Sequence, residues 1–222
     1  MFPFNQLVIF VVHRIIDMRI AVSGSHSLGK STFVKDWIAA HPSYKREEEP
    51  YRSLAGQGYD IRFRQESNRL HNGIQLFYSI SRVNAYAEST SNVIFDRSPV
   101  DYIAHSQYTA DHATTDIDDE FVKMMVQSTS DSLANLDLIV FIPISEQWPI
   151  EMEDDGIRPI DIAYRDEVDA VFKQIYRDQR FEVMPRTGGP ALLELWGSRE
   201  DRLQRLEAAV SSHQPDLDLD QP

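Results

Sequence analysis

Residues 24–31 read Gly24-Ser25-His26-Ser27-Leu28-Gly29-Lys30-Ser31, which is a complete G-x-x-x-x-G-K-[ST] sequence. In such a loop the backbone N–H groups surround nucleotide phosphates, the lysine reaches the β- and γ-phosphates, and the hydroxyl contacts Mg²⁺. We therefore expect these residues and the following Thr32 to bind a nucleotide, with Lys30 catalytic and Ser31 a metal ligand. The alternative is a glycine-rich turn that binds nothing.

The sequence on either side of the loop has the pattern expected around a phosphate site. Arg19–Val22 is a short, mainly apolar run that predicts a buried strand, with Met18 at its head. After the loop, Phe33, Val34 and Trp37 recur at helical spacing. The order strand, loop, helix points the N-terminus of the helix at a bound anion.

The composition is that of a folded domain with an acidic surface. The chain has 222 residues, enough for one α/β domain with a sizeable core, and 42% of them are hydrophobic. Its formal net charge of −13 argues against nucleic acid as a partner, because an acidic surface repels a phosphate backbone. No cysteine is present, so disulfides and thiolate ligands are excluded. We expect a cytoplasmic protein that is a monomer or a homodimer.

The two ends of the chain differ from the part between them. The apolar run Leu7–Val12 is too short to span a bilayer, so we expect no membrane association. We expect residues 1–17 to be an N-terminal extension and residues 18–212 to form the domain. Residues 213–222 are acidic and contain proline, which predicts a disordered tail.

Apolar runs alternate with helical patterns along the domain, which predicts a parallel sheet covered by helices on both faces. We therefore expect a three-layer α/β fold with five parallel strands. The strands are expected at residues 19–22, 44–50, 92–96, 136–142 and 181–184. Two helices are expected to bury apolar stripes, namely Leu70, Ile74, Phe77, Ile80 and Ala87 in one, and Phe121, Met124 and Met125 in the other.

A second polar group, Asp96-Arg97-Ser98, follows the apolar run Val93–Phe95. Ligands of open parallel sheets gather at the carboxyl ends of the strands. An acid there can reach Mg²⁺, and a guanidinium there can neutralise a phosphoryl group. We expect Asp96 to be a catalytic residue and a metal ligand, and Arg97 to be a catalytic residue. The alternative is that Asp96 caps the next helix and that Arg97 only pairs with it.

Three acids, Glu47-Glu48-Glu49, end the second expected strand at the same edge of the sheet. A carboxylate there can accept the proton of a hydroxyl that attacks the γ-phosphate. We expect Glu49 to be this base, because Arg52 lies within one turn of it, and we expect Arg52 to bind the substrate. A solvated acidic turn is the alternative.

Residues 145–165 contain prolines, acids and Gly156, which predicts a loop that can move over the edge of the sheet. Phosphoryl transfer spreads negative charge over the transferred oxygens, and a guanidinium from a closing loop can stabilise it. We expect this segment to be a lid, with Arg158 catalytic and Arg165 nucleotide-binding. Alternatively, both arginines pair with nearby acids on the surface.

The long helix expected after the second strand carries Gln75, whose amide can hydrogen-bond a base or a ribose, so we expect Gln75 to bind the substrate. Arg62, Arg64 and Arg69 lie around the start of this helix and can either meet an acceptor phosphate or form a solvated face. The seven histidines have no metal-binding spacing.

Together these motifs resemble the P-loop kinase group that includes ribosylnicotinamide kinases and related small AAA-type ATPase domains. The matching pieces are Gly24–Thr32, Glu49-Pro50-Tyr51-Arg52, Ile74-Gln75, Phe95-Asp96-Arg97-Ser98, Asp155-Gly156-Ile157-Arg158 and the helix near residues 197–206. The Asp-Arg-Ser triplet is also similar to deoxynucleoside kinases. The resemblance implies the P-loop NTPase fold with a short lid, ATP and Mg²⁺ as cofactors, and transfer of the γ-phosphate to a small hydroxyl acceptor.

Three functions fit these observations. The first is a small-molecule kinase whose acceptor is nucleoside- or nucleotide-like. The second is an ATPase or nucleotide-dependent switch that acts on a protein partner and hydrolyses ATP slowly without an acceptor. The third is an interaction module with a vestigial anion site, although the intact Lys30 and Ser31 count against it. The sequence contains no N-K-x-D motif, which counts against a GTPase.

Overall fold

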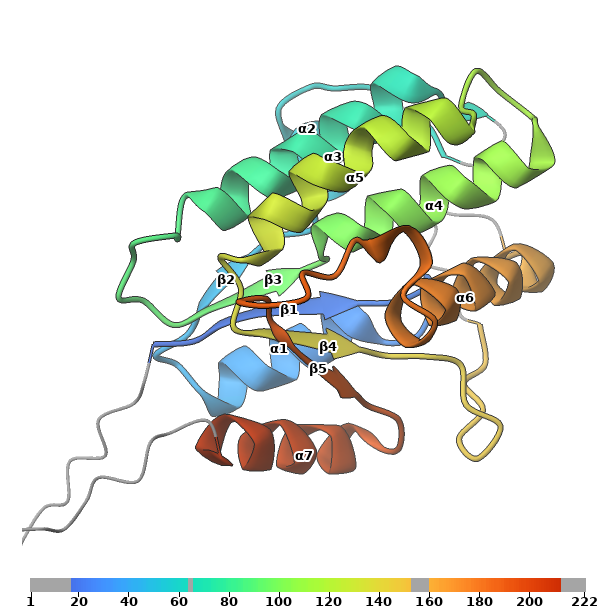
Figure 1. Cartoon of the computed structure of the whole chain (residues 1–222). Coiled ribbons are helices and arrows are strands. Elements are labelled where there is room, and N and C mark those ends of the chain that lie inside the picture. The colour runs from blue at the N-terminus through green and yellow to red at the C-terminus, as the bar shows by residue number, and fades with distance from the viewer. Residues whose placement is uncertain (1–16, 64–65, 153–159, 213–222) are drawn as a thin grey trace, which may run out of the picture.

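A sheet of five parallel strands forms the centre of the computed structural model (Figure 1). The structure describes residues 17–63, 66–152 and 160–212. In space the strands follow the order β2, β3, β1, β4, β5, and every neighbouring pair is parallel. Their bounds are Arg19–Ser23 (β1), Lys45–Glu47 (β2), Val93–Asp96 (β3), Leu138–Phe141 (β4) and Ala191–Glu194 (β5). The predicted five-stranded parallel sheet is confirmed.

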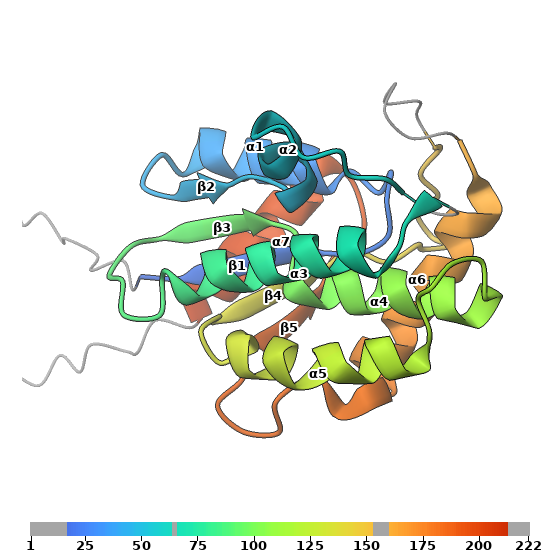
Figure 2. The same ribbon diagram turned by 90° about the horizontal axis from the view of Figure 1, so that it is seen from above.

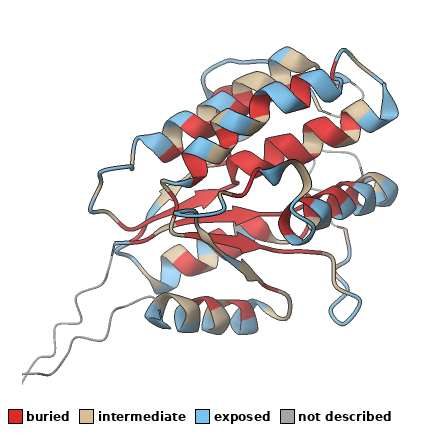
Figure 3. Cartoon of the chain, viewed as in Figure 1, coloured by how far each residue is buried: buried red, intermediate tan, exposed pale blue. Residues whose placement is uncertain are grey.

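Side chains of the central strands alternate between two hydrophobic clusters, because successive residues of a strand point to opposite faces. In β1, Ala21 belongs to one cluster, while Ile20 and Val22 belong to the other. In β3, Phe95 lies in the cluster of Ala21, and Ile94 lies in the cluster of Ile20. Both faces of the central strands β1, β3 and β4 are therefore buried, as Figure 3 shows.

Helices cover both faces of the sheet, which makes it the middle of three layers (Figures 1 and 2). Helices α1 and α7 pack on one face, and α3, α4, α5 and α6 pack on the other. The α-helices of the described residues span Lys30–Ala40 (α1), Pro50–Gly56 (α2), Arg69–Asn84 (α3), Pro99–His112 (α4), Asp119–Leu133 (α5), Ile162–Arg177 (α6) and Arg199–Ser212 (α7). The three-layer α/β architecture agrees with the prediction.

The strand register brings the polar groups of the sequence to one edge of the sheet. Val22 pairs with Asp96 across β1 and β3, and Glu47 pairs with Phe95 across β2 and β3. Because all strands are parallel, the loops that leave β1, β2 and β3 emerge at the same edge. The glycine loop, the acidic run and the Asp96-Arg97 pair therefore meet.

The last strand is not where the sequence predicts it. Residues 181–184 do not form a strand: the short 3₁₀ helix η2 spans Arg180–Glu182, and Phe181 and Glu182 have positive φ values of 66° and 51°. Val183 and Met184 are buried in a hydrophobic cluster without belonging to the sheet. The fifth strand is Ala191–Glu194 instead. Its short apolar run does not distinguish a strand from other apolar segments of the chain, so the sequence did not identify it.

The predicted buried faces of two helices are partly wrong. On α3, Leu70 and Phe77 are 71% and 55% exposed, and Ala87 lies beyond the end of the helix. The buried face of α3 contains polar as well as apolar residues, namely Asn72, Gln75, Leu76, Ser79, Ile80 and Val83. On α5, Phe121 and Met125 are buried as expected, but Met124 is exposed. Hydrophobic periodicity misassigned α3 because part of its inward face is polar.

Some of the expectations fall outside the described residues. These are residues 1–16 of the extension, the tail from residue 213 onward, Arg64, and the lid residues Gly156 and Arg158. Among residues 17–63, 66–152 and 160–212, no helix combines the length and the apolar character needed to cross a membrane.

Two neighbouring residues of α3 provide a test of its orientation. Leu76 is fully buried, so Leu76→Ala should leave a cavity and lower the free energy of unfolding by about 2–5 kcal/mol. Phe77 is exposed, and Phe77→Ala should change this free energy by less than about 1 kcal/mol. Urea denaturation followed by circular dichroism measures both values. Equal losses would mean that the Phe77 side of α3 is buried in solution.

Candidate functional site

The loop between β1 and α1 requires glycine at two positions. Gly24 has a φ of 137°, and a Cβ atom there would lie 2.5 Å from the carbonyl oxygen of Ile142. Gly29 has a φ of 79° and occupies the N-cap of α1. Residues with a side chain adopt such values only with strain. The first turn of α1 carries no acid, so its N–H groups and the positive end of the helix dipole can face an anion.

Lys30 is buried at the start of α1, and its ammonium donates a hydrogen bond to the backbone oxygen of Ser25 within the loop. Burial and the charge of Arg97 lower the pKa of Lys30 well below its usual value. The carboxylates of Asp101, Glu49 and Asp96 oppose this shift. The ammonium thus lies against the loop backbone, where a lysine of this motif contacts phosphates.

Ser31 and Asp96 form the pair of oxygen groups that a Mg²⁺ ion would need. The Ser31 hydroxyl donates to Asp96 Oδ1 at 3.1 Å, and Arg46 Nη2 donates to Asp96 Oδ2 at 2.9 Å. Mg²⁺ prefers such oxygen ligands and completes its shell with water and phosphate oxygens. The two residues therefore fit the ion. Within the described part of the chain, no cluster of three or more His, Asp or Glu side chains could hold a metal by itself.

Arg97 connects three elements at the carboxyl edge of the sheet. Its Nη1 donates to the carbonyl oxygen of Gly24 at 3.0 Å and to Asp101 Oδ2 at 3.1 Å, and its Nε donates to Glu49 Oε1 at 3.2 Å. Burial would lower the pKa of Arg97, but Glu49 and Asp101 outweigh it and raise the pKa. The backbone φ of Arg97 is 121°, a strained value for a residue with a side chain.

Asp101, on the first turn of α4, is fully buried and was not predicted from the sequence. Its Oδ1 accepts a hydrogen bond of 2.6 Å from the Ser23 hydroxyl, which in turn accepts one of 2.7 Å from the Tyr176 hydroxyl. Burial raises the pKa of Asp101, and the charge of Arg97 offsets this only in part. Asp101 also closes a capping box with Ser98, and this local pattern is the one signal that could have identified it.

Two cavities adjoin this cluster. The first, which we call the P-loop cavity, is lined by residues 27–33, by Trp148, Ile150 and Glu151, by Gly197, Ser198, Arg199 and Arg202, and by Asp36, Glu49, Arg52 and Arg97. Its floor is the second half of the glycine loop and the start of α1. Gly24 and Ser25, from the first half of the loop, are buried and line neither cavity.

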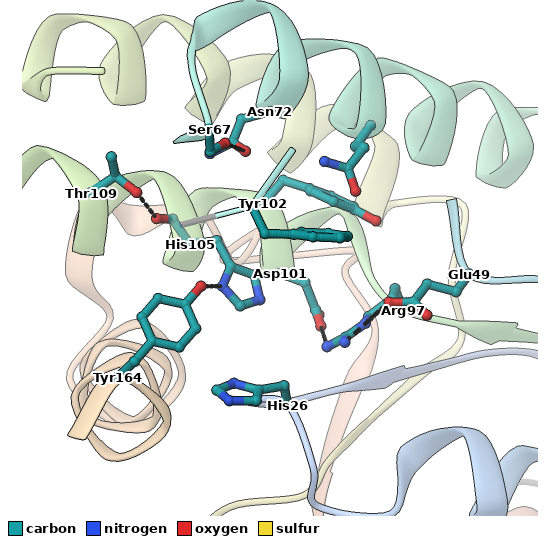
Figure 4. Close-up of a pocket in the computed structure, with 12 residues that line it drawn as sticks. His26, Glu49, Ser67, Asn72, Arg97, Asp101, Tyr102, His105, Thr109 and Tyr164 are labelled. Carbon is teal, nitrogen blue, oxygen red and sulfur yellow. Dashed lines mark hydrogen bonds and ion pairs between the residues drawn. The ribbon is translucent and has the colours of Figure 1, made fainter. Parts of the chain in front are cut away.

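The second cavity is drawn in Figure 4. Its walls combine aromatic rings with amide, hydroxyl and imidazole groups, and the Tyr164 hydroxyl lies 2.9 Å from His105 Nδ1. It is lined by His26, Glu49, Phe63, Ser67, Asn72, Gln75, Arg97, Asp101, Tyr102, His105, Thr109 and Tyr164. Glu49 and Arg97 line both cavities and therefore form the wall between them.

The structure brings most of the predicted site residues to these two cavities. Arg52 Nε lies 3.3 Å from Glu49 Oε2, on the side of the P-loop cavity. Gln75 lines the second cavity, and its Nε2 donates to the His71 carbonyl at 3.0 Å. The His26 side chain also faces the second cavity, where its ring lies 5.0 Å from that of Tyr164.

The side chain of Arg165 does not reach either cavity, unlike those of most other predicted site residues. Its guanidinium donates to the carbonyl of Ile150 at 3.0 Å and to Asp166 at 2.9 Å, and it lines neither cavity. Its backbone oxygen accepts a hydrogen bond of 2.8 Å from the Ser25 hydroxyl, so this turn of α6 is attached to the glycine loop. Arg165 thus contacts the loop through its backbone.

Several cavity residues were not found from the sequence. Among them are Trp148 and Arg202 in the P-loop cavity, and Phe63, Tyr102 and His105 in the second. None of them belongs to a short motif. They reach the site through the packing of segments that are distant along the chain.

The comparisons with known proteins agree with this geometry. A family model described as an AAA domain matches residues 19–190. The chain belongs to this AAA domain family. The matched range of the AAA domain contains the glycine loop, Glu49, Asp96, Arg97 and Asp101, but it ends before α7. No curated protein matches the chain.

Solved structures with this AAA domain's fold include two kinds of protein. The NadR protein in complex with NR has a TM-score of 0.61 and 15% identity, with 88% of this chain and 52% of the NadR chain covered. Deoxyadenosine kinase from M. mycoides, with the products dCMP and dCDP, has a TM-score of 0.61 and 13% identity, with 88% and 100% covered. The AAA domain thus spans about half of the NadR chain. At these identities the likeness establishes the fold, and the predicted P-loop family is confirmed.

Two glycines of the AAA domain test the tight packing of its loop. Gly24 and Gly58 both have positive φ values, 137° and 91°, but only at Gly24 would a new Cβ atom meet a neighbour. Gly58→Ala should cost about 1–2 kcal/mol of stability for the backbone conformation alone. Gly24→Ala should cost more and also weaken Mg-ATP binding, because the loop must move away from Ile142. Urea denaturation and calorimetry measure these effects, and equal stability of the two variants would contradict the close approach.

Proposed function

We propose that this protein transfers the γ-phosphate of ATP to a small hydroxyl acceptor that is nucleoside-like. The observation that carries the proposal is that Glu49 and Arg97 line both cavities. A group on a shared wall can contact both ligands at once. ATP would occupy the P-loop cavity and the acceptor would occupy the second cavity, so that the two ligands meet at this carboxylate and this guanidinium.

The chemistry of the P-loop cavity supports a triphosphate as its ligand. The N-terminus of α1, the buried ammonium of Lys30 and the guanidinium of Arg97 supply positive charge on one side. Ser31 and Asp96 would hold Mg²⁺, which would supply positive charge against the phosphate oxygens. Arg158 and Arg165 stay candidates for the lid, Arg158 as a catalytic group and Arg165 as a nucleotide-binding one.

The second cavity supports an uncharged, ring-bearing acceptor. The aromatic rings of Phe63, Tyr102 and Tyr164 can pack against a planar base, and the amides of Asn72 and Gln75 can hydrogen-bond its edge. Among the described residues that line this cavity there is no lysine, and Arg97 is the one arginine. These residues offer little positive charge to an acceptor that already carries a phosphate, which favours a nucleoside over a nucleotide.

In this mechanism each residue has a defined task. Lys30 and Arg97 hold the transferred phosphoryl group and neutralise its oxygens. Arg97 and Arg52 hold Glu49 in place. Glu49 accepts the proton of the acceptor hydroxyl while the hydroxyl oxygen forms a bond to the γ-phosphorus. The bond between the γ-phosphorus and the bridging oxygen breaks, and ADP leaves with that oxygen. Asp101 holds Arg97 in position.

The relatives in fold are compatible with this assignment. The M. mycoides enzyme is a deoxyadenosine kinase, and one NadR structure contains AMP-PNP. A nucleoside-like acceptor and ATP would give this chain a reaction of the same class.

The first prediction of this proposal concerns Lys30. Lys30→Ala should abolish measurable phosphoryl transfer while the protein stays folded, because the charge facing the phosphates is lost. Lys35, exposed on the same helix, is the matched control, and Lys35→Ala should keep wild-type activity. A coupled assay for ADP with circular dichroism measures both properties. Full transfer by Lys30→Ala would exclude the P-loop cavity as the donor site.

The second prediction separates Glu49 from its neighbour. Glu49→Gln should lower the rate of transfer by about 10²–10⁴-fold, the usual contribution of a general base, and should leave Mg-ATP binding nearly unchanged. Glu48→Gln is the control, since Glu48 pairs with Arg46 and lines neither cavity. Single-turnover kinetics gives the rate and calorimetry gives the affinity. Equal effects of the two substitutions would remove Glu49 from the mechanism.

The substrate itself requires a screen. Purified protein with Mg-ATP is tested with nucleosides and related alcohols, and ADP release is compared with the rate in the absence of an acceptor. Acceptor-stimulated release supports the kinase. If no compound raises the rate of ADP release above the rate without an acceptor, the alternative function is favoured, an ATPase or nucleotide-dependent switch that acts on a protein partner.

A further inference from the structure

Arg202 is a buried cation with an unusual set of partners. It lies on α7 and is 5% exposed. Its Nη1 donates to the carbonyl oxygen of Leu28 in the glycine loop at 3.0 Å, and its Nε is buried without a hydrogen-bond partner in the described part of the chain. This guanidinium therefore attaches the C-terminal helix to the phosphate-binding loop.

Apart from Lys30 in the glycine loop, the other buried charges in the described residues are paired. Arg97 faces Glu49 and Asp101, and Asp169 lies 2.7 Å from Lys173. No ion pair involves Arg202 within residues 17–63, 66–152 and 160–212, and burial alone lowers its pKa. A buried charge without a counter-charge is costly, so proteins retain one mainly where a ligand or a metal supplies the opposite charge.

Arg202 is also placed where such a ligand would bind. It lines the P-loop cavity together with residues 27–33, and its Nη1 would lie 3.4 Å from a Cβ atom added to Gly29. Gly29 is the N-cap of α1, next to Lys30 and Ser31. The unpaired guanidinium therefore borders the segment whose N–H groups face an anion.

We propose that Arg202 is a phosphate-binding residue of the nucleotide site, which supplies a positive charge from α7 to the triphosphate held by the glycine loop. The inference rests on the proposed function only in requiring that the P-loop cavity binds ATP. Arg202 lies outside the residues matched by the AAA domain model, so the family pattern does not assign it.

Calorimetry with two ligands, Mg-ATP and Mg-tripolyphosphate, tests the assignment. Arg202→Met should weaken the binding of both ligands by about 10- to 100-fold, the effect expected for one hydrogen bond to a charged group. Arg202→Lys, which keeps the charge, should retain most of the affinity. Arg205 provides the matched control: it lies on the same helix but lines neither the P-loop cavity nor the second cavity, and it donates to the carbonyl oxygens of Glu194 at 2.9 Å and Trp196 at 3.4 Å.

The outcomes separate this inference from the proposed function. Arg205→Met should bind both ligands like the wild type. The inference is overturned if Arg202→Met binds as tightly as Arg205→Met, if the binding of ATP but not of tripolyphosphate is weakened, or if Arg202→Lys loses as much affinity as Arg202→Met. If Arg202→Met does not fold, Arg202→Gln takes its place in the same comparison. Wild-type protein that binds neither ligand would overturn the proposed function itself, and this inference with it.

Discussion

The guanidinium of Arg97 is the group on which the arrangement of the site depends. It donates to the first glycine of the loop, to Glu49 after β2, and to Asp101 on α4. These anchors come from three elements, and together they hold a backbone that would otherwise avoid a φ of 121°. A strained φ of this kind persists where several contacts hold the side chain in place. Here these contacts place the Arg97 guanidinium at the wall between the two cavities.

Charge balance separates the arginines of the site into two kinds. Arg97 and Arg46 are matched by carboxylates, so they are stable without a ligand and fix the positions of Glu49 and Asp96. Arg202 is buried without such a match in the described residues, and it lines the P-loop cavity. The first kind holds Glu49 and Asp96 in place, and the second is the cation that we propose to bind the phosphates.

The long helix α3 shows how the cavity shapes the fold around it. Its inward face carries Asn72 and Gln75 at one end, because the second cavity lies there, while Leu70 and Phe77 face solvent. A helix that packed only against a hydrophobic core would have the opposite arrangement. The polar inward face lowers the apolar burial of the helix and provides hydrogen-bonding groups for a ligand.

The sequence by itself determined the features that depend on short-range chemistry. The glycine loop with Lys30 and Ser31, the acids that end β2 and β3, and the parallel α/β order all follow from adjacent residues and local periodicity. Only the tertiary structure decided the fifth strand, the inward face of α3, and the parts played by Asp101 and Arg202. The physical reason is that burial and pairing are properties of a packed neighbourhood. Arg202 meets the loop at Leu28, far away along the chain, and no local pattern encodes that contact.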